Sequence, residues 1–267
     1  MNYHDYHCHL LPGLDDGPKD LAESVDMASV LCSLGFTAVV CTPHLVKGTF
    51  ENDVGKVQDA VATLQETLTK NKIVLTLHPS VEYRLDEHLL SLLDYSMPVR
   101  ENVVLIELPR YLQPEKLLEF AYTIIQQKKL RPMIAHPERH TLFDDVSENG
   151  KLRDFLVTLS SGLKSLRTNL KSRDRDENRK DFLVERLHQM GCFFQGNIGS
   201  FAGIYGEQVR KRALRLLQMG FYDCLGTDAH CSHNLAVWLD EGMKVVARAI
   251  GEERLTSLLR PLEAPVS

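Results

Sequence analysis

Two histidines near the N-terminus, His7 and His9, have the spacing of a metal-binding pair. Residues two apart on an extended strand project from the same face, so both imidazoles can reach one point. Neutral imidazoles are common ligands of transition-metal ions. A proline and two glycines between positions 12 and 17 then break the strand and place Asp15 and Asp16 in a turn beyond it. A carboxylate from that turn can ligate a further ion, and either aspartate is a candidate.

A histidine or a carboxylate also follows short apolar runs elsewhere in the chain. Besides the N-terminal strand, these runs predict strands at 36–41, 73–77 (extending toward 81), 103–106, 132–135, 192–195 and 222–225. The candidates that come after these runs are His44, Glu82, Glu107, His136, Asp228 and His230. With His7, His9 and Asp16 they make five imidazoles and four carboxylates.

The seven predicted strands alternate with predicted helices, which are expected at about 20–34, 53–70, 114–125, 206–219, 236–250 and 252–259, with one more ending near 190. This alternation indicates parallel strands joined by right-handed crossovers. In a parallel barrel the carboxyl ends of all strands share one face, where active sites of barrel enzymes lie. We therefore expect a single α/β domain in which side chains from position 7 to position 230 converge.

Convergence of so many ionisable groups has an electrostatic consequence. Four carboxylates crowded together repel one another and take up protons unless cations are present. Nine ligands are too many for one ion but suit two or three ions with bridging carboxylates. Each residue alone has a structural reading: a single histidine after a strand is more often a hydrogen-bonding residue, and Glu82 and Glu107 can be ion-pair partners of Arg84 and Arg110. The joint occurrence favours a metal or catalytic site.

Composition excludes several other classes of protein. The net charge of −5 argues against a general nucleic-acid binder, whose surface would be basic. No run approaches the roughly 20 apolar residues of a membrane span, and the N-terminus lacks a signal-peptide pattern. The six cysteines form no Cys-x2-Cys pair, which predicts reduced thiols in a cytoplasmic protein. None has an arginine six residues on, so any phosphatase chemistry must come from something other than a thiolate.

A charged segment at about 147–181 interrupts the strand pattern. Residues 164–180 hold seven basic and three acidic side chains. Because charge runs are usually solvated faces, we expect an exposed insertion, with a dock for an acidic partner as the alternative. On this reading, deletion of about 163–180 leaves the fold and small-substrate activity intact.

Four motifs give the chain a resemblance to the PHP superfamily, named for polymerase and histidinol phosphatase: His7-Cys8-His9, Thr42-Pro43-His44, 135–139 and 227–230. Within it, the stretches 11–17, 106–109, 136–139 and 197–200 closely resemble the bacterial PHP-type protein-tyrosine phosphatases, which are associated with capsule and exopolysaccharide synthesis. The likeness runs from about Tyr3 to His230, apart from the charged segment.

This resemblance implies a distorted seven-stranded (β/α) barrel holding three divalent metal ions, often manganese, with iron or zinc as alternatives. By motif, the first ion is held by His7, His9, Glu82 and Asp228, the second by Glu82, Glu107 and His136, and the third by Asp16, His44 and His230. Glu82 bridges two ions in this scheme. Arg139 matches the phosphate-binding arginine of the family.

We therefore expect a metal-dependent phosphomonoesterase that acts on protein phosphotyrosine, carried by a bacterial tyrosine kinase that controls capsule or exopolysaccharide synthesis. Arg139 is expected to hold the phosphoryl group, since its planar fork binds phosphate bidentately. Asp228 or His230 can assist as an acid, although the phenolate leaving group, with a pKa of about 10, needs little protonation. The alternatives are a small-molecule phosphatase such as histidinol-phosphate phosphatase, a metal-dependent amidohydrolase, and a degenerate domain that only binds partners.

Overall fold

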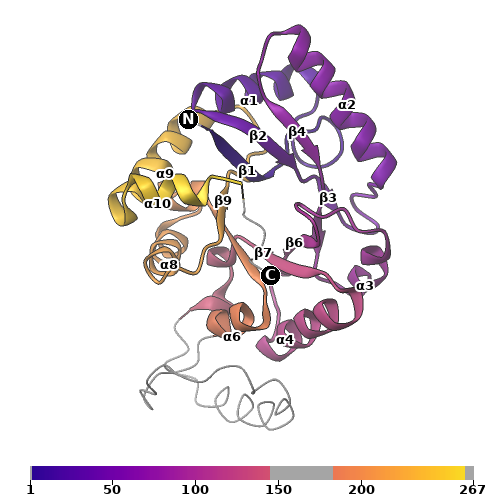
Figure 1. The fold of residues 1–267 in the computed structure, drawn as a ribbon, viewed down its shortest axis with the longest axis vertical. Helices are drawn as coiled ribbons and strands as arrows, with labels where there is room; N and C mark the ends of the chain where they lie inside the picture. The colour runs from indigo at the N-terminus through magenta and orange to yellow at the C-terminus, as the bar shows by residue number, and fades with distance from the viewer. Residues whose placement is uncertain (1, 145–182, 262–267) are drawn as a thin grey trace.

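The computed structural model describes residues 2–144 and 183–261. The charged segment predicted at 147–181 lies outside these residues. Short strands curl around the centre of the molecule and the helices lie around them on the outside (Figure 1). Every paired strand in the described part runs parallel to its neighbour, as the alternation of strands and helices predicted.

The strands form two sheets. One has the order β1-β2-β4 and the other the order β3-β5-β6-β7-β8-β9. The strands are β1 (Tyr3–Cys8), β2 (Phe36–Cys41), β3 (His44–Leu45), β4 (Thr76–Pro79), β5 (Glu82–Arg84), β6 (Val103–Glu107), β7 (Arg131–Ala135), β8 (Phe193–Asn197) and β9 (Cys224–Gly226).

The described residues thus contain nine strand segments where the sequence predicted seven strands. Two residues separate β2 from β3, and two separate β4 from β5. One of them, Pro43, has no N–H to donate to a ladder. The pairing resumes in the same register beyond the gap, since Cys41 pairs with Pro79 and His44 with Glu82. The Glu82 N–H donates to the Pro43 carbonyl across it, at 3.0 Å.

The third predicted strand, 73–77, is displaced by three residues, because β4 begins at Thr76. The residues just before β4 form the turn that follows the preceding helix, which ends at Lys70. Lys72 has a φ of +57°, and the Ile73 N–H donates to the Leu68 carbonyl at 2.9 Å. Val74 is 84% exposed, although its side chain is apolar. Tertiary context therefore overrides the local preference of this run for a strand.

The first and last strands lie side by side at their carboxyl ends. The Asp228 N–H donates to the His7 carbonyl at 2.6 Å, and the His9 N–H donates to the Ala229 carbonyl at 3.0 Å. The buried Asp5 carboxylate adds to this junction by accepting from the Thr227 backbone N–H and hydroxyl at 2.9 and 2.6 Å. The N-terminal histidines and the residues around 228 are thereby brought to the same place.

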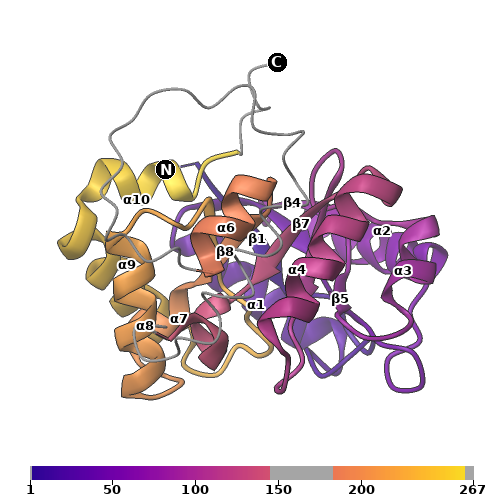
Figure 2. The same cartoon turned by 90° about the horizontal axis from the view of Figure 1, so that it is seen from below.

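Helices cover the outside of the strands (Figures 1 and 2). They are α1 (Leu21–Ser33), α2 (Val54–Lys70), α3 (Leu89–Leu92), α4 (Pro114–Thr123), α6 (Leu183–Met190), α7 (Ile198–Ala202), α8 (Glu207–Gln218), α9 (Leu235–Ile250) and α10 (Glu252–Leu258). The Asp20 and Asp53 carboxylates cap α1 and α2 by accepting backbone N–H groups of the first turn. No helix in the described ranges combines the length and the apolar character needed to span a bilayer.

The inside of the ring of strands is filled by a small apolar cluster. Its side chains come from strands of both sheets, apart from Val99, which precedes β6. They are Tyr6, Val40, Val99, Val103, Leu105, Met133, Ala135 and Cys224. On β6, Val103 and Leu105 share a face with Glu107, since side chains alternate along a strand. This apolar layer therefore lies beneath the polar residues at the strand ends and supports them.

Candidate metal centre

Four side-chain atoms from three parts of the chain face one point at the carboxyl ends of the strands. They are His7 Nε2, His9 Nε2, Glu82 Oε2 and Asp228 Oδ1. The two nitrogens are 3.2 Å apart. They lie 3.3 and 3.4 Å from Glu82 Oε2, and 3.3 and 3.2 Å from Asp228 Oδ1. All four residues are buried.

Hydrogen bonds behind the two imidazoles fix their tautomers. His7 Nδ1 lies 2.9 Å from the Gln195 Oε1 atom, and His9 Nδ1 lies 2.6 Å from Asp15 Oδ2. An amide oxygen and a carboxylate only accept, so both Nδ1 atoms carry a proton and donate it. In the neutral rings both Nε2 atoms then present lone pairs to the common point.

A divalent cation fits this set of atoms. Without one, two imidazole lone pairs and two carboxylate oxygens would face each other at van der Waals range. Neighbouring ligands of an ion bound at about 2.1 Å lie roughly 3.0 to 3.4 Å apart in octahedral and tetrahedral geometry, which matches the observed spacing. Neither Glu82 oxygen meets a donor in hydrogen-bond geometry within the described residues, although both are buried. Buried oxygens of this kind are otherwise costly.

The pKa values show the same demand for positive charge. Burial alone would lower the pKa of His7, but the Glu82 and Asp228 carboxylates outweigh it and raise that pKa to about 9. Burial would raise the pKa of both carboxyls. The imidazoles around Glu82, and His7 with Arg139 around Asp228, instead hold both well below the usual range. The carboxylates are therefore charged and require cationic partners.

His136 extends the centre on the far side of Glu82, with its Nε2 atom 3.3 Å from Glu82 Oε1. His7, Glu82, His136 and Asp228 each offer a ligand atom within a common 4.8 Å. Glu107, predicted to share an ion with Glu82 and His136, lines the same pocket as His136 but is in neither group of converging ligand atoms.

A second group of ligand atoms comes from His9, Asp16, His44 and His230. Asp16 Oδ1 lies 3.3 Å from His230 Nε2 and 3.7 Å from His44 Nε2. The Asp228 carbonyl accepts from His230 Nδ1 at 2.9 Å, which leaves the His230 Nε2 lone pair toward Asp16. This group is more open, since the Asp16 side chain is 56% exposed and that of His230 30%.

The two aspartates of the N-terminal turn have different surroundings. Asp16 points toward His44 and His230, whereas Asp15 lies behind His9. Besides the His9 imidazole, Asp15 accepts the backbone N–H groups of Gly17 and His44, both at 2.9 Å. Burial acts to raise the pKa of Asp15, but the hydrogen bond and charge of His9 hold it below its ordinary value. Asp15 is thus placed to orient His9 rather than to meet the common point.

Sequence reasoning left Asp15 open and did not single out Gln195. The only signal for Gln195 was its position at the end of the predicted strand 192–195. In the structure its Oε1 atom also accepts the backbone N–H of His136, at 3.2 Å. Gln195 therefore joins the end of β7 to the His7 ring.

Two strand ends turn through backbone conformations that are uncommon for residues with a side chain. His136 has a φ of +30° and Asp228 a φ of +51°. Left-handed conformations of non-glycine residues are strained and concentrate at functional sites. Each directs its side chain toward Glu82 or His7 at the strand end, so the strain coincides with the cluster.

Arg139 stands next to the cluster. Its Nη2 atom lies 2.7 Å from Asp228 Oδ2, and its guanidinium carbon lies 3.7 Å from the centre of the Tyr205 ring. The neighbouring Glu138, one of the carboxylates that could hold this arginine, is used elsewhere. It accepts the Tyr222 hydroxyl and the Asn197 N–H, both at 2.9 Å. Asp228 is therefore the carboxylate that holds Arg139.

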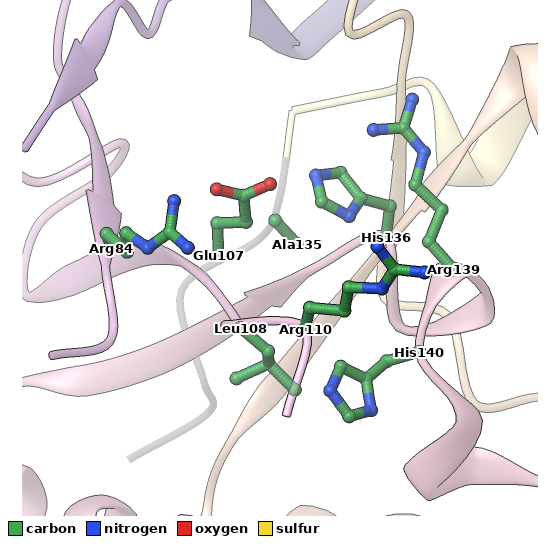
Figure 3. A pocket seen from close by; sticks show the side chains of 8 residues that line it. All are labelled: Arg84, Glu107, Leu108, Arg110, Ala135, His136, Arg139 and His140. Atoms are coloured by element: carbon green, nitrogen blue, oxygen red, sulfur yellow. The ribbon is translucent and has the colours of Figure 1, made fainter. Parts of the chain in front are cut away.

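A pocket of about 260 Å³ opens beside Arg139 and His136 (Figure 3). Its lining residues are Arg84, Glu107, Leu108, Arg110, Ala135, His136, Arg139 and His140. The pocket thus connects the buried ligand cluster with three guanidinium groups, an arrangement suited to an anionic substrate.

Known proteins that are similar to this chain agree with this arrangement. The family model described as capsular polysaccharide synthesis, CpsB/CapC, matches residues 3–166 and 175–263. The tyrosine-protein phosphatase YwqE of Bacillus subtilis is 29% identical over 258 residues, which are 93% of this chain and 85% of that protein. The tyrosine-protein phosphatase CpsB of Streptococcus pneumoniae is 23% identical over 263 residues, which are 95% and 93% of the two chains.

A solved structure is similar over nearly the whole chain. It comes from the crystal structures of YwqE from B. subtilis and CpsB from S. pneumoniae, described as unique metal-dependent tyrosine phosphatases. The TM-score is 0.73 at 28% identity, over 96% of this chain and 90% of the other. The resemblance drawn from the sequence motifs is confirmed, and the chain belongs to the CpsB/CapC family of capsular polysaccharide synthesis.

Proposed function

We propose that this protein is a metal-dependent protein-tyrosine phosphatase that removes phosphate from a phosphotyrosine protein in capsule or exopolysaccharide synthesis. The observation that carries the proposal is the convergence of His7 and His9 on Glu82 and Asp228, with each Nε2 atom within 3.4 Å of both carboxylates, beside the partly buried Arg139. The relatives of the CpsB/CapC family that carry the name tyrosine-protein phosphatase support it. The protein substrate is expected to be the tail of a bacterial tyrosine kinase.

Three divalent ions are proposed, with manganese as the expected metal and iron or zinc as alternatives. The first ion is assigned to His7, His9, Glu82 and Asp228. The third ion is assigned to Asp16, His44 and His230. The remaining, second ion is assigned to Glu82, His136 and Glu107. Glu107 would have to approach the other two, because its carboxylate lies outside the converging group. Imidazole and carboxylate ligands accept all of these metals.

Bound divalent ions supply Lewis acidity toward phosphoryl oxygens and activate water near neutral pH. The chain itself supplies the geometry. Arg139 is proposed to hold the phosphoryl group with the guanidinium edge that Asp228 leaves free, while the Tyr205 ring keeps the guanidinium plane fixed. Preorganised donors of this kind act most strongly on the charge of the transition state.

The proton-donor role predicted for Asp228 or His230 is limited by the proposed ligation of both residues. Both Asp228 oxygens are engaged, one by Arg139 and Asn197 and the other toward the histidines. His230 Nδ1 donates to the Asp228 carbonyl, and its Nε2 faces Asp16. A phenolate leaving group, with a pKa of about 10, needs only weak assistance.

We also infer that the two sheets are parts of one distorted seven-stranded (β/α) barrel of the PHP type, in a single domain. If β2 with β3 and β4 with β5 are each counted as one bent strand, the nine segments reduce to seven. The unchanged register across both breaks supports this count. The strand ends would then form one mouth, which is where barrel enzymes bind their substrates.

The absence of disulfides among the six cysteines fits a cytoplasmic location.

The proposal is tested by comparing the hydrolysis of four substrates by the manganese-loaded protein. Phosphate release is measured for a phosphotyrosine peptide, a phosphoserine peptide and histidinol phosphate, and amine release for an amide substrate. The phosphotyrosine peptide should be hydrolysed fastest, with little loss after thiol alkylation. Histidinol phosphate as the far better substrate would favour a small-molecule phosphatase instead.

A further inference from the structure

Beyond the group that holds the scissile phosphate, the pocket contains two more guanidinium groups, those of Arg84 and Arg110. Arg139 is paired with Asp228, but within the described residues no carboxylate lies within ion-pair distance of Arg84 or Arg110. Figure 3 shows both side chains at the pocket, on either side of Leu108. Two uncompensated cations therefore face the space next to the metal centre.

Arg84 is placed by the strand that carries Glu82. Side chains two apart on a strand share a face, so Arg84 is on the face that presents Glu82 to the cluster. Tyr83, between them, is fully buried, and its hydroxyl accepts the Met97 N–H at 2.8 Å. This anchoring of Tyr83 fixes the orientation of β5, and hence the direction from which Arg84 enters the pocket.

Arg110 is placed by the loop after β6, which His140 holds. His140 Nε2 donates to the Pro109 carbonyl at 2.9 Å, while its Nδ1 accepts the Leu142 N–H at 3.0 Å. Both ring nitrogens are used, and burial lowers the pKa of this imidazole. His140 therefore lines the pocket as a neutral side chain. The positive charge of the pocket comes from Arg84, Arg110 and Arg139.

The pocket has more room than one phosphoryl group requires. Its volume of about 260 Å³ equals that of roughly eight or nine liquid water molecules. Glu107, the one acidic side chain in the lining, is assigned to a metal ion in the proposed function. Guanidinium groups gathered in one pocket repel one another, and an incoming anion relieves this repulsion.

We propose that Arg84 and Arg110 form a second anion subsite, which binds a carboxylate or a second phosphate carried by the substrate near its phosphotyrosine. This inference rests on the proposed function, because it assigns the pocket beside the metal centre to a peptide. The subsite selects among phosphotyrosine sequences, whereas Arg139 acts on the phosphate that is removed. Planar guanidinium forks suit both carboxylate and phosphate oxygens.

The test uses the manganese-loaded full chain and three phosphotyrosine peptides of otherwise equal sequence. One has glutamates beside the phosphotyrosine, one has glutamines, and one has a second phosphotyrosine. The wild-type protein should show a kcat/KM about tenfold higher for the glutamate or the doubly phosphorylated peptide than for the glutamine peptide, mainly through KM. Which of the two is preferred distinguishes a carboxylate from a phosphate as the ligand.

The variants Arg110→Ala and Arg84→Ala should each reduce this preference toward unity, and Arg110→Glu should reverse it. A merely structural role would not reverse a charge preference. Arg248→Ala is the matched control, because it removes the same charge from α9, where Arg248 is 4.0 Å from Glu241. Metal content and the circular dichroism spectrum check that each variant is folded.

Equal kcat/KM values for the three peptides in the wild type would overturn the subsite, as would an Arg110→Ala effect of equal size on all of them. Both results leave a phosphotyrosine phosphatase in place. No turnover of any of the three peptides would instead overturn the proposed function, and the subsite with it.

Discussion

At the scale of single residues, the centre is defined by which atoms are left without protons. Gln195 and Asp15 accept hydrogen bonds from the protonated Nδ1 atoms of His7 and His9, and both Nε2 lone pairs then face Glu82. The sequence predicted the histidines, because the His-x-His spacing on a strand is a local signal. It did not decide between Asp15 and Asp16, because both belong to one short turn and only the path of the backbone separates them.

Arg139→Ala should retain the full metal content and the fold, because Arg139 contacts Asp228 through an oxygen that does not face the histidines. Phosphotyrosine hydrolysis should fall by about two to three orders of magnitude, as expected when one transition-state donor is lost. Arg139→Lys should recover little of the lost activity, because an ammonium lacks the bidentate fork. By contrast, His136→Ala should lower the metal content together with the activity. Near-normal turnover by Arg139→Ala would show that another group holds the phosphate.

Asp15→Asn should weaken metal binding about 10- to 100-fold, the usual effect of losing a group that orients a ligating histidine. One amide oxygen cannot replace two carboxylate oxygens that accept from His9 and from two backbone N–H groups. Calorimetric titration of metal-free protein measures this. The comparison is Asp16→Asn, which should mainly affect the more open group around His44 and His230. An unchanged metal affinity in Asp15→Asn would contradict the role of Asp15 in orienting His9.

At the scale of elements, strands bring distant residues together only where their backbones approach closely. A side chain at Gly226 would bring its Cβ within 2.8 Å of the His7 Cβ and 2.9 Å of the His7 backbone nitrogen. The glycine therefore permits the contact between β1 and β9. The strands themselves were predictable from apolar runs, but their breaks at 42–43 and 80–81 were not, because those depend on how neighbouring strands pair.

Gly226→Ala should destabilise the protein by about 1 to 3 kcal/mol, since an added methyl group in a packed interior forces backbone shifts. Because His7 is the residue displaced, metal affinity should fall as well. Gly55→Ala in α2 is the control, because its added methyl group would meet the Asp53 Oδ1 atom at 3.3 Å, the end of a side chain that a small shift can move away. Urea unfolding with and without manganese separates the two effects. A Gly226→Ala protein of wild-type stability would contradict the close approach.

At the scale of the whole molecule, residues from position 7 to position 230 share one centre, so metal binding should stabilise the entire fold. An ion that binds only the native state at 100 times its dissociation constant adds about 2.7 kcal/mol. For a chain of this size that corresponds to a rise in Tm of roughly 5 to 10 °C. Thermal unfolding of metal-free protein against increasing manganese measures the shift. A Tm that does not depend on manganese would mean that the ligands do not act together.

The central claim, that a metal held by these residues performs phosphotyrosine hydrolysis, is tested most directly by one titration. Protein stripped with EDTA is titrated with manganese while bound metal and phosphate release from a phosphotyrosine peptide are measured on the same samples. We predict no hydrolysis in the metal-free protein and a rise in rate that follows occupancy of the centre. Full activity in protein shown to contain no metal would contradict the account.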